Sequence, residues 1–177
     1  LASSRLGGPR YAQESVLAHY LTTGPLWDEL RVRRGAYGAS CYAEPLEGTF
    51  LFSTYRDPSP AESLSFFGEA LSRASAGLSA EAAEEAVVGA AGRDLKPLLP
   101  EERGFADWKR ELYGIDDAMR REKREALLST GKKELEAAAA RLAASYAEAS
   151  SVLISRAEDV QLLHSRRGDT RIVELPL

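Results

Sequence analysis

The sequence predicts an α+β fold in which helices pack on a mainly antiparallel sheet. Two observations favour this class. Apolar residues recur at helical spacing along most of the chain. One pair of neighbouring segments, by contrast, has the alternation and the connecting turn that are typical of a β-hairpin. Two short apolar stretches near the end of the chain have the length of single strands, which adds strands to the helices without producing a repeating pattern.

The first two helices are indicated by apolar stripes and a proline. The range 11–21 should form a helix, because one side of it is apolar through Val16, Leu17, Tyr20 and Leu21. Pro25 suits the first turn of a second helix. The buried side of that helix should consist of Leu26, Trp27 and Leu30. Arg31 should leave from its end, where a cation complements the helix dipole.

A β-hairpin is expected next, with strands Tyr37–Ala43 and Thr49–Tyr55 joined by a turn over 45–48. Alternation in the second strand separates two sets of residues: Phe50, Phe52 and Thr54 on one face, and Leu51, Ser53 and Tyr55 on the other. Because both sets contain apolar residues, we expect the sheet to be covered at least partly on both sides.

Helices should dominate the rest of the chain. Ser59 is the expected N-cap of a helix that ends at Gly77, and loss of this cap should cost roughly 1 kcal/mol. An extended connector is expected over 96–100. Further helices are expected over 79–92, 101–113 and 117–128, and from 130–131 onward, the last being the longest. The end of the chain should hold a strand over 151–155, a short helix over 158–164, a turn over 166–169 and a strand over 171–175.

Composition limits the class of protein. The 177 residues fit one domain, and 44% hydrophobic with 28% charged residues is ordinary for a globular chain. The formal net charge of −4 gives no basic face for nucleic acid, and no apolar run is long enough to span a membrane. The single cysteine, Cys41, cannot form an internal disulfide, which slightly favours a reducing compartment. We expect a cytoplasmic location, because nothing in the sequence argues for secretion. Residues 1–9 have the pattern of the tail of a strand followed by a loop, so we expect a piece of a longer polypeptide.

The stretch Leu30–Gly38 carries the candidate functional residues. The planar fork of donors on Arg31 suits a carboxylate or a peptide carbonyl, and the Tyr37 hydroxyl can donate to an oxygen that gains charge. Gly35 and Gly38 allow positive φ angles and the close approach of another chain. From the spacing alone, a solvated helix-end arginine and a half-buried strand tyrosine are the stronger interpretation.

A family resemblance changes that balance. Arg31 followed after six positions by the tyrosine of Gly-Ala-Tyr-Gly resembles the arginine–tyrosine pair of the pitrilysin/insulinase-type zinc metallopeptidases, and most closely their presequence-protease and falcilysin-like branch. The similarity continues through 49–58 and returns at 108–116, so it covers nearly the whole chain. Arg34 stands where that branch usually has a glycine.

The resemblance implies that residues 1–177 form a single substrate-binding C-terminal domain, a fragment of a longer chain that lacks its first strands. It places the zinc ion and its His-x-x-Glu-His motif in the N-terminal half of the same polypeptide, which is the expected partner. This segment should then hold no catalytic and no metal-binding residue and be inactive alone. Its histidines, His19 and His164, each lack a second histidine at helical spacing, and for His19 we favour a structural or surface role.

The resemblance also assigns roles within the candidate stretch. Arg31 would bind the substrate backbone carbonyl near the cleavage site. Tyr37 would donate to the carbonyl oxygen as it becomes tetrahedral, and Gly35 and Gly38 would let the substrate strand approach. The substrates would be unstructured peptides that are degraded inside a closed chamber.

Two other functions stay open. The chain could be a domain of a non-catalytic homologue that acts as a scaffold or processing partner, or a generic α+β interaction domain. An intact zinc motif upstream would favour the peptidase, and a degraded motif would favour the scaffold.

Overall fold

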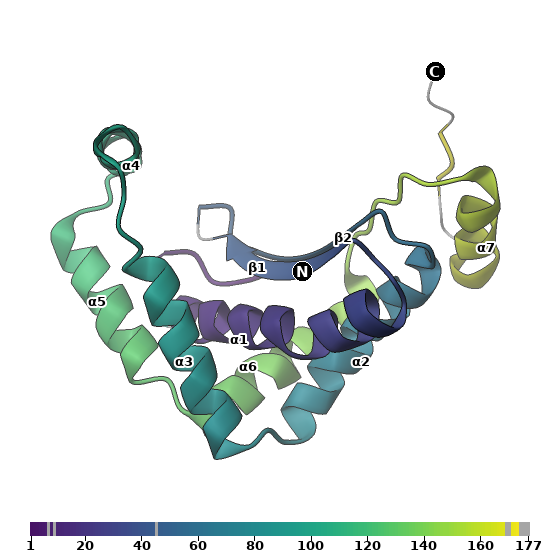
Figure 1. The fold of residues 1–177 in the computed structure, drawn as a ribbon, viewed down its shortest axis with the longest axis horizontal. Helices are drawn as coiled ribbons and strands as arrows, with labels where there is room; N and C mark the ends of the chain where they lie inside the picture. The colour runs from purple at the N-terminus through teal and green to yellow at the C-terminus, as the bar shows by residue number, and fades with distance from the viewer. Residues whose placement is uncertain (7, 9, 45, 169–170, 174–177) are drawn as a thin grey trace.

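The computed structural model describes residues 1–6, 8, 10–44, 46–168 and 171–173. Two antiparallel strands, β1 (Gly38–Glu44) and β2 (Thr49–Tyr55), lie on a layer of helices (Figure 1). The helices are α1 (Tyr11–Thr23), the π-helix η1 (Trp27–Arg33), α2 (Pro60–Ala76), α3 (Ala80–Asp94), α4 (Pro100–Leu112), α5 (Asp117–Leu128), α6 (Lys132–Ala144), the short η2 (Tyr146–Glu148) and α7 (Ala157–Arg167). The predicted α+β class is therefore confirmed.

The hairpin has one buried face and one open face. Its register pairs Cys41 with Phe52 and Ala43 with Phe50 on the side that meets the helices, and Phe50 is 1% exposed. Tyr42 and Leu51 form a pair on the other side, with exposed fractions of 48% and 37%. Among the described residues no element covers that side, as Figure 1 shows. The predicted alternation is confirmed, but the expectation of cover on both faces was wrong.

The core lies between the inner face of the hairpin and helices α1, α2 and α6. The stripe predicted for α1 is fully buried at Val16, Leu17 and Leu21. Phe52 stacks on Phe67 of α2, with ring centroids 4.7 Å apart, and so joins the sheet to that helix. Each large side chain that is fully buried here contributes about 1.5–3 kcal/mol relative to an exposed one. These contacts hold β1 and η1 in place and thereby position the candidate stretch.

Residues 1–3 lie along the outer edge of β2. The Phe50 amide donates to the Leu1 carbonyl oxygen at 2.8 Å, and the Ser3 amide donates to the Gly48 carbonyl oxygen at 2.8 Å. Ala2 bridges Thr49 in antiparallel fashion. The expectation that the chain opens on the end of a strand agrees with this pairing.

Three expectations about the later elements were wrong. Residues 151–155 form no strand, since no neighbouring strand offers them backbone partners, and Val152 and Ile154 are 89% and 80% exposed. Residues 171–173 also form no strand, and 174–175 lie outside the described residues. Among the helices of the described residues, the longest is α2 with 17 residues, whereas α6 has 13.

Candidate functional site

Arg31 lies in the last turn of η1, where the backbone is wound more widely than in an α-helix. The Arg34 amide donates to the Glu29 carbonyl oxygen at 3.0 Å, five residues back, which is the π-helical pattern. The Arg31 guanidinium carbon lies 4.0 Å from the centroid of the Trp27 ring. Stacking of this kind is favourable for arginine and restricts its direction. Arg31 is therefore held at the surface rather than free in solvent.

The turn between η1 and β1 requires one of the two predicted glycines for its geometry. Gly35 has φ = +79°, in the left-handed region where a side chain is strained. Gly38 is instead a regular member of β1, paired with Tyr55, and a Cβ at this position would make an ordinary 3.6 Å contact with the Tyr55 Cβ. Arg34 has an ordinary helical backbone, so its position needs no glycine.

Tyr37 stands just before β1 with 65% of its surface exposed. Its ring meets the ring of Tyr55 edge-on at 6.0 Å. The Arg56 guanidinium lies 5.7 Å from the Tyr37 ring centroid and 5.4 Å from that of Tyr55. Arg56 has φ = +48°, the one positive φ at a non-glycine residue among the described residues. A strained backbone angle of this kind persists only where the surrounding structure maintains it. Such angles are common at functional sites.

Arg31, Trp27 and Tyr55 line the same hollow, which has a volume of about 300 Å³. It lies at the edge of β1, and its lining consists of Thr22, Trp27, Arg31, Gly38, Ala39, Ser40, Ser53, Thr54 and Tyr55. Gly38, Ser40, Ser53 and Tyr55 share the open face of the hairpin. Tyr37 is not part of the lining, but it contacts Tyr55, which is. Arg31 and Tyr37 thus belong to one surface through Tyr55, without sharing a single cavity.

The neighbouring arginines have structural partners. Glu29 pairs with Arg33 at 3.1 Å and with Arg34 at 2.9 Å. The hydrogen bond from Arg34 is the main cause that lowers the pKa of the Glu29 carboxyl below its ordinary value. Arg31 makes no such pair among the described residues, so its donors are available to a ligand.

The sequence reasoning missed three residues of this surface. Trp27 was assigned to the buried side of its helix, but it is 44% exposed and supports Arg31. The spacing of four residues between Trp27 and Arg31 could have indicated the stacking. The hairpin register places Tyr55 opposite Gly38, beside Tyr37, whereas nothing local in the sequence indicates the position of Arg56.

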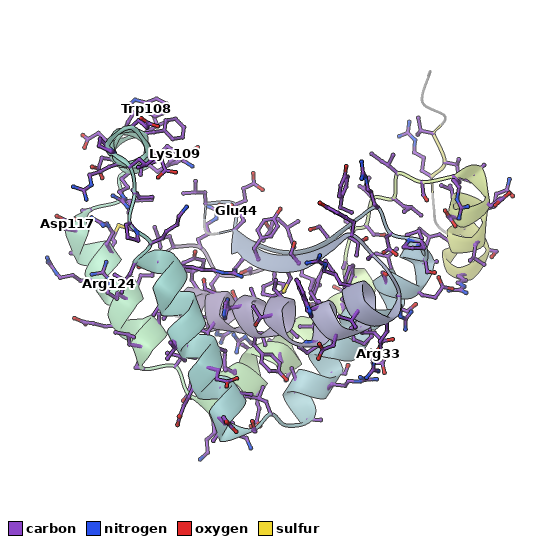
Figure 2. The ribbon with its side chains drawn as sticks, viewed as in Figure 1. Arg33, Glu44, Trp108, Lys109, Asp117 and Arg124 are labelled. Carbon is purple, nitrogen blue, oxygen red and sulfur yellow. The ribbon has the colours of Figure 1, made fainter. Side chains whose placement is uncertain are left out.

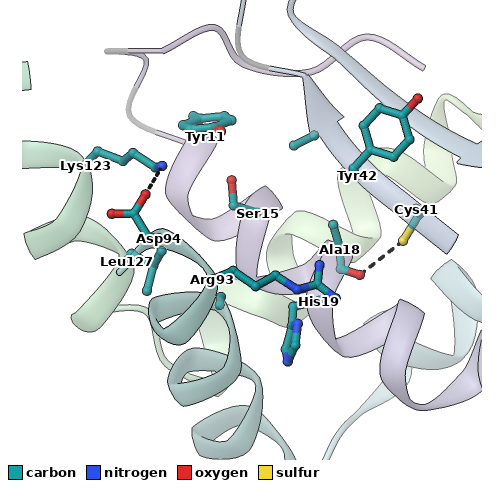
Figure 3. Close-up of a pocket in the computed structure, with 12 residues that line it drawn as sticks. Tyr11, Ser15, Ala18, His19, Cys41, Tyr42, Arg93, Asp94, Lys123 and Leu127 are labelled. Atoms are coloured by element: carbon teal, nitrogen blue, oxygen red, sulfur yellow. Dashed lines mark hydrogen bonds and ion pairs between the residues drawn. The ribbon is translucent and has the colours of Figure 1, made fainter. Parts of the chain in front are cut away.

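A second hollow, of about 250 Å³, lies between α1, α3, α5 and β1 and includes His19, Arg93, Asp94 and Lys123 (Figure 3). Burial, and then the Arg93 guanidinium, lower the pKa of the His19 imidazole. The Asp94 carboxylate pairs with Lys123 at 2.5 Å. The His19 ring lies against Gly89 of α3, where a Cβ would be 1.8 Å from Nε2. This packing between helices agrees with a structural role for His19.

No group of three or more histidine, cysteine or acidic side chains could hold a metal ion in the part of the chain that the structure describes. None of the helices in the described ranges combines the length and the apolar character that crossing a membrane requires.

Comparison with known proteins adds a family. A sequence model described as the PreP C-terminal domain matches residues 8–157. Presequence protease 1, chloroplastic/mitochondrial, of Arabidopsis thaliana is 28% identical over 155 residues, which are 87% of this chain and 14% of that protein. The mitochondrial presequence protease of Xenopus laevis is 32% identical over 128 residues, 72% of this chain and 12% of that protein. The mouse protein of the same name is 30% identical over the same shares.

This chain therefore spans 12–14% of the length of these relatives. The organelles in their names are those of the relatives, so the expected cytoplasmic location stays a prediction for this chain.

Proposed function

Because the chain belongs to the PreP C-terminal domain family, we propose that it is the substrate-binding domain of a longer zinc metalloendopeptidase that degrades unstructured peptides. By the family resemblance, the zinc ion would lie in the N-terminal half of the polypeptide, outside this chain. The observation that carries the proposal is the surface that half-buried Arg31 forms with the exposed rings of Trp27, Tyr55 and Tyr37 beside the open face of the hairpin.

Arg31 is suited to hold a peptide backbone. Its guanidinium offers several N–H donors in one plane, and a peptide carbonyl is a strong acceptor. The Trp27 ring at 4.0 Å supports one side of the guanidinium, so less conformational freedom is lost when a substrate binds. The hollow beside Arg31 leaves room for a substrate segment along Gly38, which has no side chain on the open face.

Tyr37 is suited to act on the same peptide. Its phenol hydroxyl can donate to the carbonyl oxygen as the oxygen gains negative charge, and one such donor is worth about 3 kcal/mol of barrier when it is preorganised. The Tyr55 ring and the Arg56 guanidinium supply that preorganisation, because they contact the Tyr37 ring from the end of β2. The reaction needs the opposite half of a chamber, so this domain alone would not hydrolyse peptides.

Substitutions in the complete polypeptide test the proposal. Tyr37→Phe removes only the hydroxyl and should lower kcat about 100-fold with little change in KM. Arg31→Ala should lower kcat/KM mainly through a higher KM, because the guanidinium binds substrate in the ground state as well. Arg33→Ala is the matched control, since Arg33 is an exposed arginine whose partner is Glu29. Turnover near the unsubstituted rate in both test variants, with the fold intact, would refute the assigned roles.

The non-catalytic alternative has its own outcome. If the complete polypeptide carries a degraded zinc motif and cleaves no peptide, the domain belongs to a non-catalytic homologue that acts as a scaffold or processing partner. In that case Arg31→Ala and Tyr37→Phe would leave partner binding unchanged.

A further inference from the structure

Helix α4 carries an apolar face that the described part of the chain leaves uncovered. Phe105, Trp108 and Leu112 are three and four residues apart, so they lie on one side of the helix, and we call them the α4 face. Their exposed fractions are 61%, 58% and 62%. No residue of α4 is buried, and the helix makes no substantial packing with any other described helix or strand. Figure 2 shows Trp108 and Lys109 on this helix, at one end of the molecule.

The composition of α4 is that of a docked helix. The Phe105 and Trp108 rings stack with centroids 5.7 Å apart, so the face is already ordered. A helix of 13 residues is marginal in water without tertiary contacts. An apolar stripe on an otherwise charged helix normally lies against a partner. Asp107 and Arg110 pair with each other at 2.5 Å, so these charges need no complement on that partner.

The position of α4 indicates which kind of partner covers the α4 face. In Figure 1, α1 and α6 lie on one side of the hairpin, and α4 is raised on the other side, which is the open face. The hollow beside Arg31 lies at the edge of β1 and is lined in part by Ser40 and Ser53 of this open face. Residues 100–112 lie within the matched range 8–157, so α4 belongs to the family domain. More than four fifths of each relative's length lies outside the aligned part, which leaves enough chain for a further domain as the partner.

We infer that the α4 face binds an apolar surface on another domain of the same longer polypeptide. This inference rests on the proposed function only in taking the chain as one part of a longer protein. Docking at α4 would join that domain to the open side of the hairpin and fix the distance between Arg31 and whatever faces it. The α4 face would in this way hold the substrate-binding surface at a fixed position relative to the other domain.

The area of the face favours a tethered partner over a second copy of the chain. Large side chains bury about 150–250 Å² each, so three that are more than half exposed can bury only a few hundred Å². Stable associations of separate proteins bury about 1,200–2,000 Å² in total. A domain of the same polypeptide needs much less, because the covalent link supplies a high effective concentration.

Hydrogen exchange in the complete polypeptide tests the inference. The amides of 103–112 should exchange roughly 100-fold or more slowly than in an unstructured peptide, because a docked helix opens rarely. The double substitution Phe105→Asp and Trp108→Asp should remove that protection. Val88→Asp is the matched control, since Val88 is 72% exposed on α3 and should leave α4 unchanged. Tyr37→Phe should also leave α4 protected, which separates this test from the test of peptide cleavage.

Three outcomes would overturn the inference. The first is fast exchange of α4 in the complete polypeptide, which would mean that the face stays in solvent. The second is protection that disappears on dilution, which would mean that a second copy covers the face. The third is protection that arises only with vesicles of phosphatidylcholine, which would assign α4 to a lipid surface. Each result is obtained whether or not the protein cleaves peptides.

Discussion

At the scale of single residues, glycines set how closely the elements approach. Gly89 lets the His19 ring of α1 lie against α3, and Gly68 of α2 faces the Tyr146 ring, where a Cβ would be 2.7 Å from a ring carbon. Neither glycine is explained by its own φ angle, because both lie inside helices. The absence of a side chain at these positions leaves the space that the two rings occupy. It therefore allows α1 to pack closely on α3, and Tyr146 to pack closely on α2.

Cys41 should make stability fall at high pH. Burial raises the pKa of its thiol to about 12, and the Sγ atom donates to the Ala18 carbonyl oxygen at 3.3 Å. The unfolded thiol has a pKa of about 8.5. The Cys41 contribution is therefore fully present below about pH 8.5 and is lost as the pH rises toward 12, because only the unfolded state then releases the proton. The loss should be about 1.4 kcal/mol per pH unit in that window.

Denaturant unfolding between pH 8 and 11 measures this slope. Other groups titrate in the same range, so the informative quantity is the difference between the native protein and Cys41→Ala, which lacks the thiol. Cys41→Ala should be less stable at pH 8 because of the cavity it leaves, and its stability should fall less steeply with pH. Equal slopes for the two proteins would show that the buried thiol does not govern the effect.

At the scale of elements, the sequence pattern predicted the helices and their bounds to within a few residues, but not which helix starts are capped by a side chain. Ser59 precedes α2 as predicted, yet its side chain accepts no hydrogen bond from the helix, because its backbone angles of −138° and 62° are not those of a cap. Ser79 has extended angles, and its hydroxyl accepts from the Ala82 amide at 3.0 Å. The predicted strand over 151–155 was also wrong. A short apolar run forms a strand only where another strand offers backbone partners.

The two serines give a matched test of capping. Ser79→Ala should lower the free energy of unfolding by about 1 kcal/mol, because the Ala82 amide loses its acceptor. Ser59→Ala should change it by only a few tenths of a kcal/mol, contrary to the cost predicted from the sequence, because no cap bond is lost. Denaturant unfolding of both variants measures the difference. Equal losses, or the larger loss at Ser59, would contradict this reading of the two helix starts.

At the scale of the whole molecule, the sequence indicated which residues are apolar but not which apolar surfaces are covered. Tyr42 and Leu51 on the outer face of the hairpin are large apolar side chains, as are the three residues of the α4 face, and their exposure depends on which distant elements pack nearby. The residues of the candidate site also fall into two groups, those that the sequence indicated and those that only the structure brings together. Arg31 and Tyr37 were found through the family resemblance, whereas Trp27, Tyr55 and Arg56 join them only through the hairpin register and the π-helix.

Glu14 is the residue where the start of the chain, α1 and α6 meet, so its substitution should affect the whole molecule. It is 3% exposed, its Oε2 accepts from the Ser3 hydroxyl at 2.5 Å and the Ser4 amide at 2.9 Å, and its Oε1 lies 3.5 Å from Arg141. Glu14→Gln keeps the shape but replaces one acceptor with a donor and removes the charge opposite Arg141. The loss should be about 1–3 kcal/mol, because buried polar groups then lack partners.

Thermal unfolding and hydrogen exchange together test this link. Glu14→Gln should lower the melting temperature and speed exchange at residues 3 and 4, since the carboxylate is what ties that segment to α1. Glu84→Gln on α3 is the control, because Glu84 is exposed and should have little effect. If Glu14→Gln lowers stability while residues 3 and 4 keep their exchange rates, the cost arises at Arg141 alone. If neither property changes, the network does not join the three elements, and the pairing of residues 1–3 with β2 must hold the start of the chain by itself.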